Sequence, residues 1–146
     1  MKKVIYTTII GKYDILEEPS FIPEGYDFIC FTDQKINKPN SIWEIRQVLP
    51  LYKDNTRTAR KYKILPHRFL PEYDISVWVD GNILVISDIR DLVKKNNYQV
   101  FDHNKTILDP RDCIYQEYNA IIQLGQHSGN YKDNPAIMHN QISRYL

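Results

Sequence analysis

The sequence predicts an α/β protein in which helices cover a mostly parallel β-sheet. Short runs of β-branched and apolar residues alternate with stretches of helical periodicity, which is the order found around parallel sheets. Two of these runs, Val4 to Ile10 and Asp27 to Thr32, are mostly apolar, as strands are when both faces of a sheet are covered. A length of 146 residues predicts one domain over residues 1–146 with a sizeable core.

Composition places the chain among globular proteins and excludes several classes of function. Apolar residues make up 42% and charged residues 25% of the chain, as in ordinary soluble domains. A net charge of +1 provides no overall field for nucleic acid or a membrane surface. Cys30 and Cys113 have neither zinc-site spacing nor the pattern of a disulfide framework. Because no long apolar run or signal peptide is present, we expect a reduced, cytoplasmic protein without a transmembrane segment.

The first half of the chain predicts three strands and a helix. Gly11 to Asp14 breaks the first strand, and Asp33 stands just past the end of the second. Trp43 to Val48 alternates apolar with polar residues, which predicts a half-exposed edge strand. Residues 54–70 then change to a helical period, and Pro66 should end this helix or begin a second short one.

The second half of the chain predicts a strand over Ile75 to Asp80, which leads to the candidate site, followed by shorter elements. Ser87 and Asp88 have the character of a helix cap. The remaining predicted elements are a strand over Ile83 to Ile86, a helix over Ile89 to Lys95, a short strand at Val100 and Phe101, and helices over Ile114 to Leu124 and Ala136 to Tyr145.

The strand over residues 75–80 ends in Asp80, Gly81 and Asn82, which places two oxygen-bearing side chains one residue apart. Because the carboxyl ends of parallel strands meet at one edge of a sheet, we expect this turn to lie beside Asp33 and the Gly11–Asp14 loop. Carboxylate and amide oxygens suit a hard divalent cation that is shared with phosphate. The alternative interpretation of Asp80 to Asn82 is an ordinary turn.

Basic residues on the predicted helix offer a second component of a phosphate site. Arg57 and Arg60 are three residues apart on one helix face, and Lys63 continues this stripe. Arginine binds phosphate with paired hydrogen bonds, so these residues could hold a diphosphate. The alternative interpretation is a solvated helix face. The histidines share no metal-ligand spacing, so we expect them at the surface.

Several of these segments resemble a known family. The chain resembles the glycosyltransferase-like family named in plants for its TOD and MUCI members, which was formerly a domain of unknown function. The matching segments follow one another along most of the chain, and they are Tyr6 to Asp14, Tyr26 to Asp33, Arg57 to His67, Tyr73 to Ile83 and Arg111 to Glu117.

The resemblance implies a GT-A-like fold, an α/β architecture related to the Rossmann fold. Asp80-Gly81-Asn82 corresponds to the Asp-x-Asp-type motif of such enzymes, with Asp80 and Asn82 as ligands of Mn²⁺ or Mg²⁺. The basic helix corresponds to the one that precedes this motif. The donor-binding residues that the resemblance implies are Thr7, Thr8, Ile9, Tyr13, Asp33, Arg57, Arg60, Lys63, Asp80, Gly81 and Asn82.

The chain also departs from the family pattern. Asn82 in place of a second aspartate predicts weaker binding of the free cation. Asp109-Pro110-Arg111 stands where relatives often have His-Pro-Arg. Relatives continue beyond the position of Leu146 with an acceptor-side segment, so we expect that part to be missing here.

These inferences predict a hexosyltransferase-type enzyme of polysaccharide biosynthesis. We expect it to bind a nucleotide-activated sugar, such as a UDP-sugar, with a divalent cation and to transfer the sugar to a hydroxyl of a saccharide, lipid-linked or protein acceptor. The alternative is a non-catalytic nucleotide-sugar-binding module. A haloacid-dehalogenase-type phosphatase is set aside, because Trp78 occupies the position of its nucleophile. No catalytic residue is identified, and both inversion and retention of configuration remain open.

Overall fold

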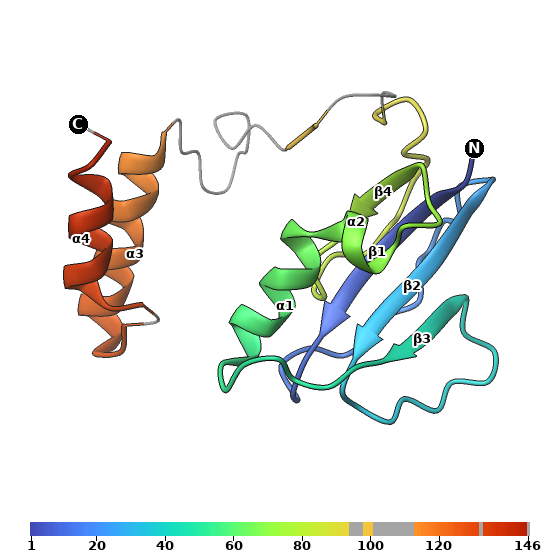
Figure 1. Cartoon of the computed structure of the whole chain (residues 1–146), viewed down its shortest axis with the longest axis horizontal. Coiled ribbons are helices and arrows are strands. Elements are labelled where there is room, and N and C mark those ends of the chain that lie inside the picture. The colour runs from blue at the N-terminus through green and yellow to red at the C-terminus, as the bar shows by residue number, and fades with distance from the viewer. Residues whose placement is uncertain (94–97, 101–112, 132, 146) are drawn as a thin grey trace. The chain divides into compact units, whose positions relative to one another are not determined.

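The computed structural model describes residues 1–93, 98–100, 113–131 and 133–145. The chain divides into two compact units, residues 1–97 and residues 98–146. The first unit holds a parallel sheet with two helices, and the second holds a pair of helices (Figure 1). None of the described helices is long and apolar enough to cross a membrane.

The sheet of the first unit has four parallel strands in the order β3-β2-β1-β4. The strands are β1 (Lys3–Ile9), β2 (Tyr26–Thr32), β3 (Trp43–Gln47) and β4 (Ile75–Trp78). All four were expected within two residues of these bounds, and β3 lies at an edge, as its alternating sequence predicted. The parallel sheet with its helices confirms the predicted α/β fold class.

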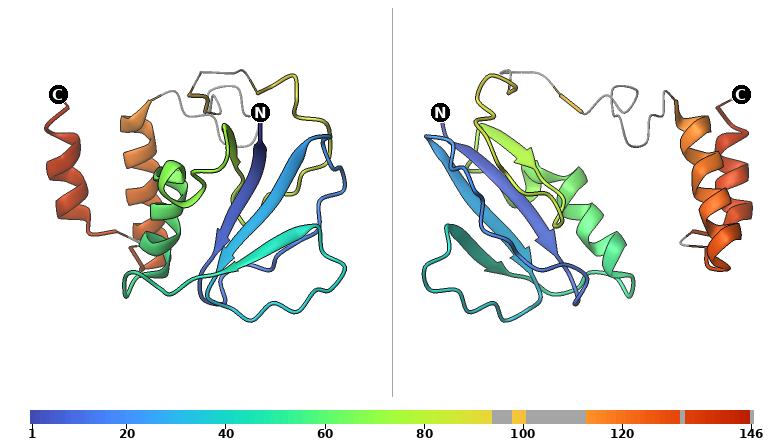
Figure 2. Two further views of the ribbon diagram at one scale, coloured as in Figure 1. Left: turned by 45° about the vertical axis from the view of Figure 1, so that its right-hand side comes forward. Right: turned by 180° about the vertical axis from the view of Figure 1, so that it is seen from behind.

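Helix α1 (Asn55–Ile64) lies against one face of the sheet (Figures 1 and 2). It begins after Asp54, whose side chain accepts a hydrogen bond from the Arg57 backbone amide at 3.0 Å, a favourable helix cap. Pro66 then begins the short helix α2 (Pro66–Phe69), because proline lacks the amide proton that the interior of a helix requires. The predicted division of this region at Pro66 is therefore confirmed.

Two separate cores bury the two faces of the sheet. The helix-side core packs the aromatic ring of Tyr62 from α1 on that of Phe31 from β2, with 4.9 Å between ring centroids. The other face is covered by loops, and Ser20 and Phe21 join those loops through hydrogen bonds to the carbonyl of Val85. The helix-side core contains Val4, Tyr6, Ile29, Phe31, Tyr62 and Leu70, and the loop-side core contains Ile5, Ile9, Leu16, Tyr26, Phe28, Cys30, Trp43 and Val85.

The region after β4 differs from the sequence prediction. Ile83 to Ile86 forms no strand, because Val85 packs into the loop-side core instead of pairing with another strand. The predicted helix after Asp88 is also wrong within the described residues 89–93. The Asp88 carboxylate accepts a hydrogen bond from the Arg90 amide at 3.0 Å, which is a turn two residues long. Val100 is not in a strand, and residues 94–95 and 101 lie outside the described part.

The second unit is an α-helical pair. Helix α3 (Ile114–Ser128) extends four residues beyond its predicted end, to the left-handed Gly129, and helix α4 (Pro135–Ile142) begins after the capping side chain of Asn134. The Tyr115 hydroxyl donates to the Tyr145 carbonyl at 2.9 Å, which ties the start of α3 to the end of the chain. Both predicted helices are present, and α4 ends three residues before the predicted Tyr145.

Candidate functional site

Loops that follow neighbouring strands are tied together at the carboxyl edge of the sheet. The carboxylate of Asp33, just after β2, accepts a hydrogen bond from the backbone amide of Gly11, just after β1, at 2.9 Å. Gly11 has a φ of 69°, a left-handed conformation that glycine adopts without strain. The expected convergence of Asp33 with the Gly11–Asp14 loop is therefore present in the structure.

The same loop contacts the turn after β4. A Cβ atom added at Gly81 would lie 2.7 Å from Oδ2 of Asp14 and 3.0 Å from its Cβ. The Asp14 side chain thus lies directly against the backbone of Gly81, and only glycine leaves room for it. Asp14 had been assigned no role from the sequence, although it ends the loop that the sequence placed at this edge.

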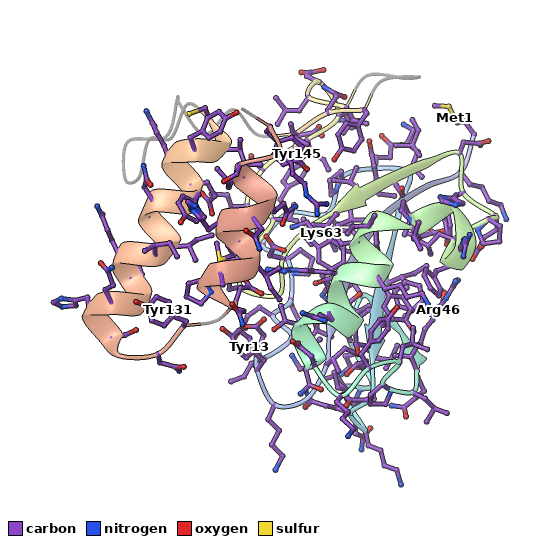
Figure 3. The ribbon with its side chains drawn as sticks, turned by 60° about the vertical axis from the view of Figure 1, so that its left-hand side comes forward. Met1, Tyr13, Arg46, Lys63, Tyr131 and Tyr145 are labelled. Carbon is purple, nitrogen blue, oxygen red and sulfur yellow. The ribbon has the colours of Figure 1, made fainter. Side chains whose placement is uncertain are left out.

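These two loops line an open pocket of about 330 Å³, at the lower end of the range for small-molecule sites. Asp14 and Asn82 both line it, and neither side chain forms a hydrogen bond with a described residue. Tyr13 is 75% exposed at the same loop (Figure 3). The pocket is lined by Tyr13, Asp14, Ile15, Glu17, Gly81, Asn82, Ile83 and Leu84.

Asp80 is held by one of its two carboxylate oxygens. Its Oδ1 accepts hydrogen bonds from the indole nitrogen of Trp78 at 2.7 Å and from the Lys63 ammonium at 3.0 Å. Its Oδ2 accepts none from the described residues. Partial burial would raise the pKa of Asp80, but the Trp78 and Lys63 hydrogen bonds and the lysine charge outweigh burial and lower that pKa. Asp80 is therefore ionised at neutral pH, with one oxygen available to a ligand.

The basic residues of α1 are not equivalent in the structure. Arg57 pairs with Asp54 at 3.7 Å in the first turn of the helix. Lys63 is six residues further on, which is about 9 Å along the helix axis, and it reaches Asp80. Arg60 is exposed and forms no ion pair with a described residue. Of the three, Lys63 is thus the residue that the fold brings to the Asp80 turn.

The candidate residues on β1 lie inside the protein. Thr7, Thr8 and Ile9 are 1%, 5% and 2% exposed, and Ile9 packs in the loop-side core. The hydroxyls of Thr7 and Thr8 have no hydrogen-bond partner among the described residues. Because side chains alternate along a strand, Thr7 faces the loop side and Thr8 faces α1. In this conformation none of the three presents a side chain to the pocket.

The donor set of this edge fits a cation only if the cation brings ligands of its own. Asp14, Asp80 and Asn82 offer two carboxylates and an amide, and the described residues contain no cluster of three His, Cys, Asp or Glu side chains placed to hold a metal ion. Mg²⁺ is commonly held by one or two carboxylates, with water and substrate phosphates as its further ligands. A divalent cation held at this edge would therefore need water or phosphate oxygens as further ligands.

The amino-acid sequence of this chain is similar to those of known proteins. The family model of the TOD1/MUCI70 glycosyltransferase-like domain matches residues 1–145. The probable hexosyltransferase MUCI70 of Arabidopsis thaliana is 21% identical over 159 residues, an alignment that covers 97% of this chain and 26% of that protein. The chain therefore spans about a quarter of the length of this relative. No solved structure shows a significant match.

Proposed function

Because this chain belongs to the TOD1/MUCI70 glycosyltransferase-like family, we propose that it binds a nucleotide-activated sugar together with a divalent cation and transfers the sugar to an acceptor hydroxyl. A general glycosyltransferase-like role follows from the family. The observation that carries the finer proposal is the meeting of the loops after β1 and β4 in one pocket that Asp14 and Asn82 line. Asp80 does not line this pocket, but it immediately precedes Gly81 in the same turn.

Asp80, Asn82 and Asp14 are the residues that would hold the cation. When bound, Mn²⁺ or Mg²⁺ supplies positive charge that stabilises the diphosphate as it leaves the sugar. Asp80 is kept ionised by Trp78 and Lys63, so it is ready to bind at neutral pH. Because Gly81 has no side chain, the Asp14 carboxylate can lie against its backbone.

The pocket has room for part of a nucleotide sugar, and we assign to it the diphosphate and the sugar. Glu17 also lines the pocket, and its backbone carbonyl accepts a hydrogen bond from the Trp43 indole at 2.9 Å, which fixes this loop on the core. If transfer inverts the sugar configuration, Glu17 is the carboxylate left to accept the proton of the acceptor hydroxyl. If transfer retains configuration, a phosphate oxygen of the donor takes that proton.

Calorimetric titration tests this function. UDP should bind the protein in the presence of Mn²⁺ and should lose most of its affinity when the cation is removed with EDTA. Asp80→Asn should weaken this cation-dependent binding at least about tenfold, since it removes the ionised ligand. Asp74→Asn is the matched control, because Asp74 precedes β4 at the opposite end of the same strand and bonds the Lys2 amide.

A donor-hydrolysis assay separates an enzyme from a binding module. Release of free sugar from a UDP-sugar, dependent on Mn²⁺ and lost in Asp80→Asn, supports transfer chemistry. Cation-dependent UDP binding without hydrolysis or transfer to any acceptor supports the non-catalytic module instead. Equal UDP affinity in the wild type, in Asp80→Asn and in EDTA would contradict the proposed site.

A further inference from the structure

Lys63 forms an ion pair with Asp80, the carboxylate that we propose as a ligand of the divalent cation. Lys63 Nζ lies 3.0 Å from Asp80 Oδ1 and 5.3 Å from the centroid of the Trp78 ring. The Trp78 indole nitrogen donates to the same oxygen at 2.7 Å. Ammonium, indole and carboxylate thus form one compact cluster at the end of β4, with Lys63 projecting from α1 (Figure 3).

The backbone of Lys63 is held in place, whereas its exposed ammonium group can exchange partners. The hydroxyl of Tyr6 donates to the carbonyls of Tyr62 and Lys63, at 3.5 and 3.2 Å, so the last turn of α1 is anchored to the central strand β1. The side chains of Lys63 and Asp80 are 45% and 57% exposed. Ion pairs this exposed are weak and exchange readily, so the Lys63 ammonium can leave Asp80 without any movement of the helix.

We propose that Lys63 is an exchangeable counter-ion of Asp80, which a divalent cation displaces and which then pairs with the diphosphate that the cation brings. This inference rests on the proposed function, because it assumes that Asp80 binds the cation. A carboxylate whose Oδ1 is held by an ammonium presents a weakened site to a free cation. A lysine with a flexible four-carbon side chain is a point-charge ligand for phosphate, and this one starts within contact of the cation site.

If this exchange occurs, removing the Lys63 charge should change the affinities for two ligands in opposite directions. Free Mn²⁺ must compete with the Lys63 charge, so removing that charge strengthens its binding. A nucleoside diphosphate with Mn²⁺ gains an ion pair from the displaced lysine, so removing the charge weakens its binding. A residue that only stabilised the fold would shift both affinities in one direction or neither.

Isothermal titration of the full chain with MnCl₂ alone, and with UDP at saturating Mn²⁺, tests the proposal. Lys63→Met should bind Mn²⁺ alone about two- to tenfold more tightly and UDP with Mn²⁺ about three- to tenfold more weakly. Lys63→Arg keeps the charge and should not tighten the binding of Mn²⁺ alone. Lys61→Met is the matched control, since it removes a charge from the same helix, where Lys61 lies 5.6 Å from the centroid of the Tyr52 ring.

The outcomes distinguish this proposal from the function on which it rests. If the wild type binds UDP with Mn²⁺ but Lys63→Met shifts both affinities in the same direction, or neither, the exchange is overturned and the proposed function stands. If neither the wild type nor Lys63→Met binds UDP in a Mn²⁺-dependent manner, both are overturned. An unchanged melting temperature of Lys63→Met shows that the fold is intact, and Lys63→Gln provides a second charge removal if Lys63→Met unfolds.

Discussion

Gly81→Ala provides a direct test of how the pocket is built. The added methyl group would lie 2.7 Å from Asp14 Oδ2, 3.1 Å from Asp14 Cγ and 3.0 Å from Asp14 Cβ, whereas carbon contacts are favourable near 3.5–4.0 Å. The φ of Gly81 is not in the left-handed region, so alanine meets no backbone strain there. The whole effect of the substitution should therefore come from the contact with Asp14.

We expect Gly81→Ala to lower the free energy of unfolding by about 1–3 kcal/mol, the usual range for overpacking. Asp14→Ala removes the two closest carboxyl atoms and leaves only Cβ, which can shift by the few tenths of an ångström that the new methyl needs. In the Asp14→Ala background, Gly81→Ala should then cost less than about 1 kcal/mol. The coupling between the two substitutions should exceed about 1 kcal/mol, as for residues in direct contact.

Urea denaturation of the wild type, the two single variants and the double variant measures this coupling. Gly25→Ala is the control, because Gly25 has a φ of 78° and nothing within 4 Å of an added Cβ. Its cost comes from the backbone and should be the same with or without Asp14. A Gly81→Ala cost that is equal in both Asp14 backgrounds would refute the contact, and with it the construction of the pocket.

Three further predictions concern the two cores. A thiol reagent should label Cys113 rapidly and Cys30 only after unfolding, because Cys30 is fully buried and Cys113 is exposed; two fast thiols by absorbance titration would contradict the burial. Burial raises the pKa of Cys30 to about 12, so the unfolded chain loses this proton first. Stability should therefore fall above about pH 9 by up to about 1.4 kcal/mol per pH unit, and urea titrations at several pH values should show a shallower fall for Cys30→Ala than for the wild type. Tyr62→Ala should cost about 3–5 kcal/mol in unfolding free energy, whereas Tyr98→Ala, at a residue that is 94% exposed, should stay within about 0.5 kcal/mol.

The sequence predicted the strands best where burial is continuous. The runs that became β1 and β2 are apolar on both faces, and this pattern fits a covered parallel sheet better than a helix. Ile83 to Ile86 carries a similar apolar run, yet Val85 enters the core from a loop. Periodicity records burial and not pairing partners, so it could not separate these two cases.

The candidate site was predictable in its location and not in its contacts. The rule that ligands bind at the carboxyl ends of parallel strands correctly brought Asp33, the loop after β1 and the Asp80 turn to one edge. The Lys63–Asp80 pair and the contact of Asp14 with Gly81 depend on the placement of a helix and a loop relative to the sheet, which residue spacing does not encode. The ligand-binding roles of these residues stay predictions until binding is measured.

The walls of the pocket and the interior of the protein are made from consecutive residues. Ile15 and Glu17 line the pocket on either side of the buried Leu16, and Leu84 lines it immediately before the buried Val85. Replacing a wall residue alters the pocket and leaves its neighbours in place, whereas inserting or deleting one residue would exchange a wall side chain for an interior one. Divergence of ligand preference in this architecture should therefore proceed by substitution at constant loop length.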